Sequence, residues 1–365
     1  MAEKSEEEGS EADDFAVTAF QEWLRITAQG FQDHFELEKA TEIMRPYSIN
    51  AGIALANNAS KMLGLEAKGI ENLAYEWEFL DFSVGIVSQT EITEFGTRTI
   101  ATSCPFHNGP AILCINHFDQ GPDAWAHFMV PEIMHGKFIE ALYEGKGRCF
   151  GHCSQISDLG RILGAKPIKT IKITNMDPVK KRAVQSLILT DWWEFFLSMF
   201  VDQVGSQKVV ELLGPKFYDL GAQDWKRFNE EYGIGTGHVE INELMEAFSK
   251  MFGRESRPIV QKKDSLHGEI LKCPFSNCLV EMCLLIGEYL KGLCHEADPG
   301  SRFSYVKMMT KGDPICIWRI DRGVGKKEME GSRNKDDLIY RLKQRLVNGE
   351  ITKEEYKELY SLITE

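Results

Sequence analysis

Two short stretches of the sequence, "SCPFHN" at residues 103–108 and "KCPFSN" at residues 272–277, carry the same Cys-Pro-Phe-x-Asn block. Their cysteines lie 169 positions apart, since 273 − 104 = 169. Proline at the second position of the block ends a strand, so each block can form a strand-to-helix corner. Two metal-ligand loops, or a reactive thiol with a second copy, would also explain the recurrence.

The same offset relates a much longer part of the chain. From Glu22 to Cys114, fifteen of the 93 ungapped pairs are identical, whereas chance would give about five or six. Beyond Cys114 the offset becomes 167, which pairs Cys149 with Cys316. The sequence therefore predicts a tandem duplication with a small length change after the corner.

Each half has the same order of local patterns. Apolar residues three and four positions apart at 15–80 predict helices, and alternating stretches at 82–104 and 257–273 predict antiparallel strands. A helix at 279–294 and two strands around the turn "KGDP" at 311–314 follow the second block. We therefore predict an α+β fold: two tandem duplicated domains of helices packed on antiparallel strands, plus a C-terminal helical hairpin.

The predicted boundaries follow from these patterns. They are an acidic disordered tail at 1–14, a first repeat domain at 15–180, a second repeat domain at 181–325 and the helical hairpin at 332–365.

Composition narrows the classes of partner. The chain of 365 residues has a net charge of −13, and binding to nucleic acid or an anionic membrane requires a concentrated basic face. The acidic N-terminus lacks the basic and apolar segments of a secretory signal, and the apolar segment at 192–201 is too short to span a bilayer. We expect a cytoplasmic protein whose nine cysteines are reduced.

The C-terminal stretch "KDDLIYRLKQRLVNGEITKEEYKELYSLI" at 335–363 predicts two helices joined near Asn348 and Gly349. It resembles the SHOCT short C-terminal domain, which has a leucine-rich helix, a Gly-x-Ile-Thr-x-Glu-Glu turn and a closing helix. The resemblance implies a hairpin that supports assembly, so we expect a homo-oligomer formed through this segment.

Cysteine and histidine recur at a short spacing in the first half. Cys104 with His107 and Cys149 with His152 have a spacing found in metal sites, which makes them candidate ligands for zinc or iron. The alternative is that cysteines such as Cys114 are small core residues.

A longer pattern occupies the second half. Cys273-Pro-Phe is followed by Cys294-His295-Glu-Ala-Asp298 and then by the segment "KGDPICIWRI", which contains Cys316. The pattern resembles the L-2-amino-thiazoline-4-carboxylic acid hydrolases. The resemblance implies hydrolytic opening of a C–N bond in a small cyclic amidine that carries a carboxylate.

Cysteine thiolate is a strong nucleophile at neutral pH, and a neighbouring histidine can lower its pKa. The candidate catalytic residues are therefore Cys273, Cys294, His295, Asp298 and Cys316. Asp298 would orient a histidine or hold a cationic group of the substrate. The first half departs from the pattern, because Trp125 takes the position of Cys294.

Two other functions stay open. Cysteine-bearing strands also resemble the four-vinyl-reductase-type domains, which implies a sensor that binds a small ligand or a metal without catalysis. A pseudoenzyme scaffold whose paired domains bind a protein is the other alternative.

Overall fold

A computed structural model describes residues 3–65, 68–115, 121–133, 135–140, 148–232, 238–262 and 265–321, together with Tyr356 and Tyr360. The chain divides into two compact units. Unit 1 comprises Met1–Phe217, Ala247–Arg254 and Cys273–Glu288, and unit 2 comprises Tyr218–Glu246, Glu255–Lys272 and Tyr289–Glu365.

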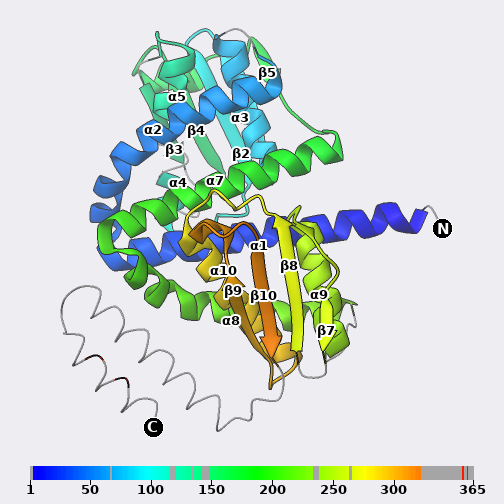
Figure 1. Cartoon of the computed structure of the whole chain (residues 1–365). Coiled ribbons are helices and arrows are strands. Elements are labelled where there is room, and N and C mark those ends of the chain that lie inside the picture. The colour runs from blue at the N-terminus through cyan, green and yellow to red at the C-terminus, as the bar shows by residue number, and fades with distance from the viewer. Residues whose placement is uncertain are drawn as a thin grey trace. The chain divides into compact units, whose positions relative to one another are not determined.

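In the first half of the chain, long helices precede the first strand pair, and shorter helices lie between the later strands (Figure 1). In chain order the elements are α1 (Glu3–Phe35), α2 (Leu37–Leu63), α3 (Ile70–Ser83), β1 (Val87–Thr93), β2 (Gly96–Ser103), α4 (Ala111–Ile115), α5 (Gly121–Met129), β3 (His135–Glu140), β4 (Cys149–Ser154), α6 (Leu159–Gly164) and β5 (Lys169–Ile171).

The second half has a similar order. Its elements are α7 (Pro178–Val204), α8 (Ser206–Tyr232), α9 (His238–Met251), β6 (Glu255–Ser256), β7 (Val260–Lys262), β8 (Ser265–Lys272), α10 (Val280–Ala297), β9 (Arg302–Lys307), a 3-10 turn, η3 (Met309–Lys311), and β10 (Cys316–Asp321). Helix α7 begins at Pro178 as predicted, because the first helical position requires no backbone N–H donor.

The described strands form two antiparallel sheets, which confirms the α+β class. The first sheet has the order β3-β4-β2-β1-β5, and the second has the order β6-β8-β10-β9 with β7 also paired to β8. The predicted strand pairs are present as β1 with β2, β7 with β8, and β9 with β10.

Aromatic side chains join α1 to α7 inside unit 1, where Figure 1 shows the two helices side by side. Trp23 and Trp193 are fully buried with ring centroids 5.1 Å apart, and Phe31 meets the edge of Phe200 at 5.4 Å. The Trp193 indole also donates a hydrogen bond of 2.9 Å to the Thr27 hydroxyl. Burying several large rings supplies most of the local stabilisation, because the hydrophobic effect scales with apolar area removed from water.

Unit 2 contains a close crossing between the second part of α8 and the end of α10. A Cβ atom at Gly221 would collide with the Tyr289 carbonyl oxygen, and one at Gly292 would collide with the Tyr218 carbonyl oxygen. The Tyr289 hydroxyl donates a 2.8 Å hydrogen bond to Asp224 at this crossing. Glycine is therefore required here because it permits the two backbones to approach.

Elements at corresponding positions of the two halves have matching bounds. Helices α1 and α7 end 169 residues apart, α2 and α8 begin and end 169 residues apart, and so do β2 and β8. The pairs β3/β9 and β4/β10 match at an offset of 167. The order β3-β4-β2-β1 in one sheet corresponds to β9-β10-β8-β7 in the other.

The remaining sequence expectations concern the N-terminal segment, the C-terminal hairpin and membrane-spanning helices. Helix α1 begins at Glu3, inside the segment 1–14 for which the sequence predicts a disordered tail. Acidic residues at a helix N-terminus interact favourably with the helix dipole, which is a physical reason for this difference. Apart from Tyr356 and Tyr360, the predicted hairpin at 332–365 lies outside the described residues. None of the described helices combines the length and apolar character that a bilayer span requires.

The break between α1 and α2 generates a prediction. Glu36 has φ 62° and ψ 156°, while Gly205 at the matching position between α7 and α8 has φ 85°. A non-glycine residue at positive φ is strained by about 1–3 kcal/mol. We expect Glu36→Gly to stabilise the protein by about 1 kcal/mol in urea unfolding.

The neighbouring Glu38→Gly variant is the matched control. Glu38 is also exposed but lies in the first turn of α2, so glycine there should destabilise the protein by about 0.5–1 kcal/mol. Equal effects of the two substitutions would contradict the strain at Glu36.

Candidate functional site

Three cysteines of the first half lie close together around the Cys-Pro-Phe corner. Cys104 follows β2, Cys114 lies in α4, and Cys149 begins β4, and all three are buried. Burial raises the pKa of Cys104 and of Cys114 to about 12, and the other cysteines of the trio add smaller contributions in the same direction. These two thiols are therefore protonated at neutral pH and are poor nucleophiles.

The two candidate histidine ligands are engaged elsewhere. His107 Nδ1 lies 2.8 Å from the Cys104 carbonyl oxygen, and His152 Nδ1 lies 3.0 Å from the Ser154 hydroxyl. Because side chains alternate along β4, His152 and Cys149 point to opposite faces of the strand. Among the described residues, no group of three or more histidine, cysteine or acidic side chains is arranged to hold a metal ion.

The second half carries a cysteine trio on the corresponding elements. Cys273 follows β8, Cys283 lies in α10, and Cys316 begins β10. Cys283 and Cys316 are buried, and the Cys316 sulfur accepts a 3.2 Å hydrogen bond from the Met309 N–H. Cys273 is half-buried, whereas its counterpart Cys104 is buried.

The candidate catalytic residues after Cys273 lie in unit 2. Cys294 is fully buried in α10, and burial, followed by the nearby Asp298 charge, raises its pKa to about 12. Asp298 donates its backbone N–H to the Cys294 carbonyl oxygen, and the His295 ring packs near Tyr218 at 6.3 Å. The structure thus places Cys294 beside Asp298, while the predicted convergence of both with Cys273 stays a prediction.

The turn that contains Cys273 also contains Cys278. Burial and then the Glu194 carboxylate raise the pKa of this half-buried thiol to about 12. Glu194 also accepts a 3.2 Å hydrogen bond from the Leu279 N–H, and burial raises the pKa of the neighbouring Asp191 to about 6. Cys278 is consequently a half-buried thiol held in its protonated form.

Arg254, which no sequence motif identified, packs among three phenyl rings in unit 1. Its guanidinium carbon lies 5.1 Å from the ring centroid of Phe248, 5.8 Å from that of Phe252 and 5.6 Å from that of Phe275. The residue is 8% exposed, and its Nε is buried without a hydrogen-bond partner. No carboxylate among the described residues forms an ion pair with it.

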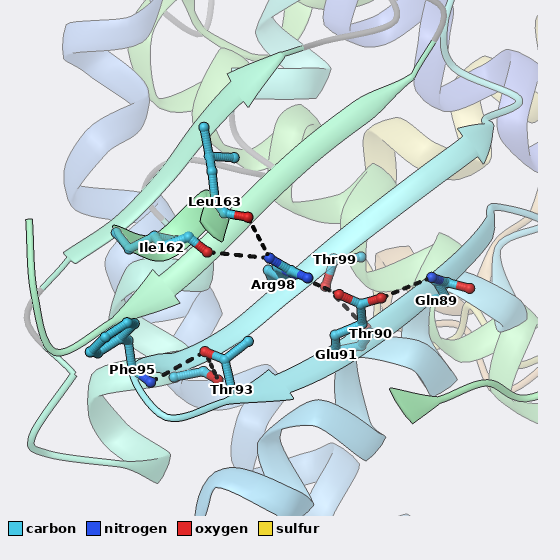
Figure 2. A network of polar contacts seen from close by, with 10 residues as sticks. Gln89, Thr90, Glu91, Thr93, Phe95, Arg98, Thr99, Ile162 and Leu163 are labelled. Atoms are coloured by element: carbon cyan, nitrogen blue, oxygen red, sulfur yellow. Dashed lines mark hydrogen bonds and ion pairs between the residues drawn. The ribbon is translucent and has the colours of Figure 1, made fainter. Parts of the chain in front are cut away.

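Arg98 is a second arginine with little exposure, and its guanidinium has partners. In Figure 2 its side chain points toward the Glu91 carboxylate and the end of α6. Its Nε donates to Glu91 at 2.5 Å, and one Nη donates to the carbonyl oxygens of Ile162 and Leu163 at 3.2 and 3.1 Å. Arg98 is therefore compensated by a charge and two acceptors, whereas the described residues offer Arg254 neither.

Glu76 is a buried carboxylate of the first half that has two hydrogen-bond donors. Glu76 accepts hydrogen bonds from the Ser60 hydroxyl at 2.5 Å and from the Trp125 indole at 2.8 Å. At the 169 offset, Met245 takes the position of Glu76. The two donors compensate the burial of this acid, because a buried polar group requires a partner.

No family model matches this chain, and no curated protein matches it either. Its function is consequently inferred from the residues and their geometry.

A signal for Arg254 does exist in the sequence: its counterpart at the 169 offset is Gly85, so the two halves differ there in charge and size. In the folded protein Arg254 is buried beside three phenyl rings, so the sequence difference places a charge at a buried position.

Glu76 generates a prediction about pH. Burial raises its pKa above the ordinary value of 4.5, so between that value and the folded-state pKa the folded protein binds more protons than the unfolded chain. This contribution to stability therefore decreases as pH rises through the window. The Glu76→Gln variant does not titrate in this window. The denaturation midpoint of the variant minus that of the unmodified protein should therefore become more positive as the pH is raised from about 4.5 to about 7.5.

Glu42→Gln is the control with the opposite sign. Lys39 lowers the pKa of the exposed Glu42 by a side-chain hydrogen bond and by charge, so its small stabilisation is lost as pH falls. Parallel pH profiles for the Glu76→Gln variant and the unmodified protein would rule out the buried, titrating carboxylate.

Proposed function

We propose that this protein is a tandem duplication whose second copy hydrolyses a C–N bond in a small cyclic amidine carboxylate, with Cys273 as the nucleophile. The observation that carries the proposal is the accessibility of Cys273. Of the second-half thiols named by the sequence pattern, Cys294 and Cys316 are buried and Cys273 is half-exposed.

Reciprocal contacts in unit 1 support the duplication. Tyr47 donates a 3.1 Å hydrogen bond to Asp202, and Lys216 lies 3.4 Å from Asp33. At the 169 offset, Asp33 corresponds to Asp202 and Tyr47 to Lys216. Reciprocity of this kind is expected of a two-fold interface between equivalent surfaces. An experimental structure in which β2 with its corner fails to superpose on β8 with its corner would exclude the duplication.

The proposed reaction uses one water. The Cys273 thiolate adds to the amidine carbon, and the tetrahedral adduct expels the ring nitrogen, which leaves as an amine after taking up a proton. Water then attacks the same carbon, and the sulfur of Cys273 leaves as the regenerated thiol. The product is a ring-opened carbamoyl compound with a free amine.

A second candidate function is a non-catalytic module that binds a small ligand or a metal. The protonated thiols of Cys104 and Cys114 favour it for the first copy, since neither is disposed to act as a nucleophile. A pseudoenzyme scaffold is the remaining alternative. For each of these functions we propose a cytoplasmic homo-oligomer assembled through the C-terminal hairpin, and sedimentation of the full chain with and without residues 332–365 tests that assembly.

The nucleophile is tested with 2-amino-thiazoline-4-carboxylate. Cys273→Ala should lower the rate of ring opening, measured as release of free amine, by at least about a thousandfold, because loss of a covalent nucleophile removes the whole pathway. Cys278→Ala is the matched control, since it removes another half-buried thiol from the same turn and should change the rate only slightly.

Two results would contradict the hydrolase. Full activity of Cys273→Ala would exclude this nucleophile. Binding of the amidine by the unmodified protein without ring opening would favour the non-catalytic module instead.

A further inference from the structure

Arg254, whose buried Nε has no hydrogen-bond partner among the described residues, is the feature of unit 1 that most requires an explanation. A guanidinium removed from water loses its hydration, and proteins usually compensate the loss with a carboxylate and hydrogen-bond acceptors. Arg98 receives both. Around Arg254 the described residues provide three phenyl rings, whose cation–π attraction offsets the loss of hydration only in part.

The geometry points to Arg254 as the residue that binds the carboxylate of a small organic ligand. Arginine suits this role because its planar fork of donors matches the two oxygens of a carboxylate. The buried Nε has no acceptor among the described residues, and an ion pair beside the surrounding phenyl rings is strengthened by their apolar character.

The chemistry of the surroundings favours a singly charged ligand. One guanidinium faces the three phenyl rings, and the whole chain carries a net charge of −13. A phosphate group carries more charge and more acceptor oxygens than one guanidinium can match. A monocarboxylate attached to a flat ring matches both the single charge of the guanidinium and the aromatic character of its surroundings.

The position of Arg254 links this carboxylate site to Cys273. Phe275, one of the three rings, lies two residues after Cys273 in the corner turn, where the Ser276 N–H bonds the Cys273 carbonyl oxygen. A ligand whose carboxylate is held by Arg254 is thus anchored near the turn that carries the accessible thiol. In the first half, Gly85 replaces the arginine, so that position lacks this anchor.

The choice of heterocycle rests on the proposed function, but the carboxylate anchor does not. The experiment therefore uses a stable pair of probes, thiazole-4-carboxylate and its neutral analogue thiazole-4-carboxamide, together with acetate and acetamide. Affinity for the full-length protein is measured by calorimetry and by the shift in Tm at constant ionic strength.

We expect the carboxylates, and not the amides, to bind and to raise the Tm. Arg254→Met should weaken carboxylate binding by more than about tenfold, because it removes one partner of a buried charge pair. Arg254→Lys keeps the charge and should retain part of the affinity. Arg257→Met is the matched control, since Arg257 is exposed and already pairs with Glu269 at 2.6 Å.

Equal binding of carboxylates and amides, no binding of either, or unchanged carboxylate affinity in Arg254→Met would overturn the inference. If Arg254→Met does not fold, the comparison of carboxylate with amide and the Arg254→Lys variant decide the matter. Arg254-dependent carboxylate binding without ring opening of the thiazoline would support the anchor and count against the hydrolase, so the two failures are distinguishable.

Discussion

The contact between α1 and α7 is the interaction on which unit 1 depends. Trp23, Trp193, Phe31 and Phe200 are fully buried there, and the Trp193 indole bonds the Thr27 hydroxyl between the same two helices. Large rings remove much apolar area from water, and the hydrogen bond fixes their register because an unpaired buried indole N–H would be costly. Helices from both halves of the sequence are thereby joined in one compact unit.

The same contact also determines the surroundings of the second corner. In unit 1, Phe20 packs against Phe252 and Phe275, and Trp23 stacks on Phe252. The aromatic group that holds the helices together therefore extends to two of the rings around Arg254. The buried Nε of Arg254 lies beside this close-packed aromatic core and has no acceptor among the described residues, which is the observation behind the proposed carboxylate anchor.

Much of the fold was predictable because its signals are local. Alternation marked the strand pairs, proline ended the strand at each corner, and Asp177 with Pro178 marked the start of α7. The cysteines were predictable as candidates, but not their accessibility. Cys104 and Cys273 occupy the same position in the repeated block, yet one is buried and the other half-exposed, since exposure depends on neighbours distant in sequence.

Periodicity and identity at a constant offset are properties of the chain alone, and they were sufficient for the α+β class, the order of elements and the 169-residue correspondence. The folded structure was needed to establish which thiols are buried and that His152 and Cys149 face opposite ways. It was also needed to show that the buried Nε of Arg254 has no acceptor among the described residues. The physical reason is that burial and charge compensation are set by contacts between residues far apart in sequence, which no local pattern specifies.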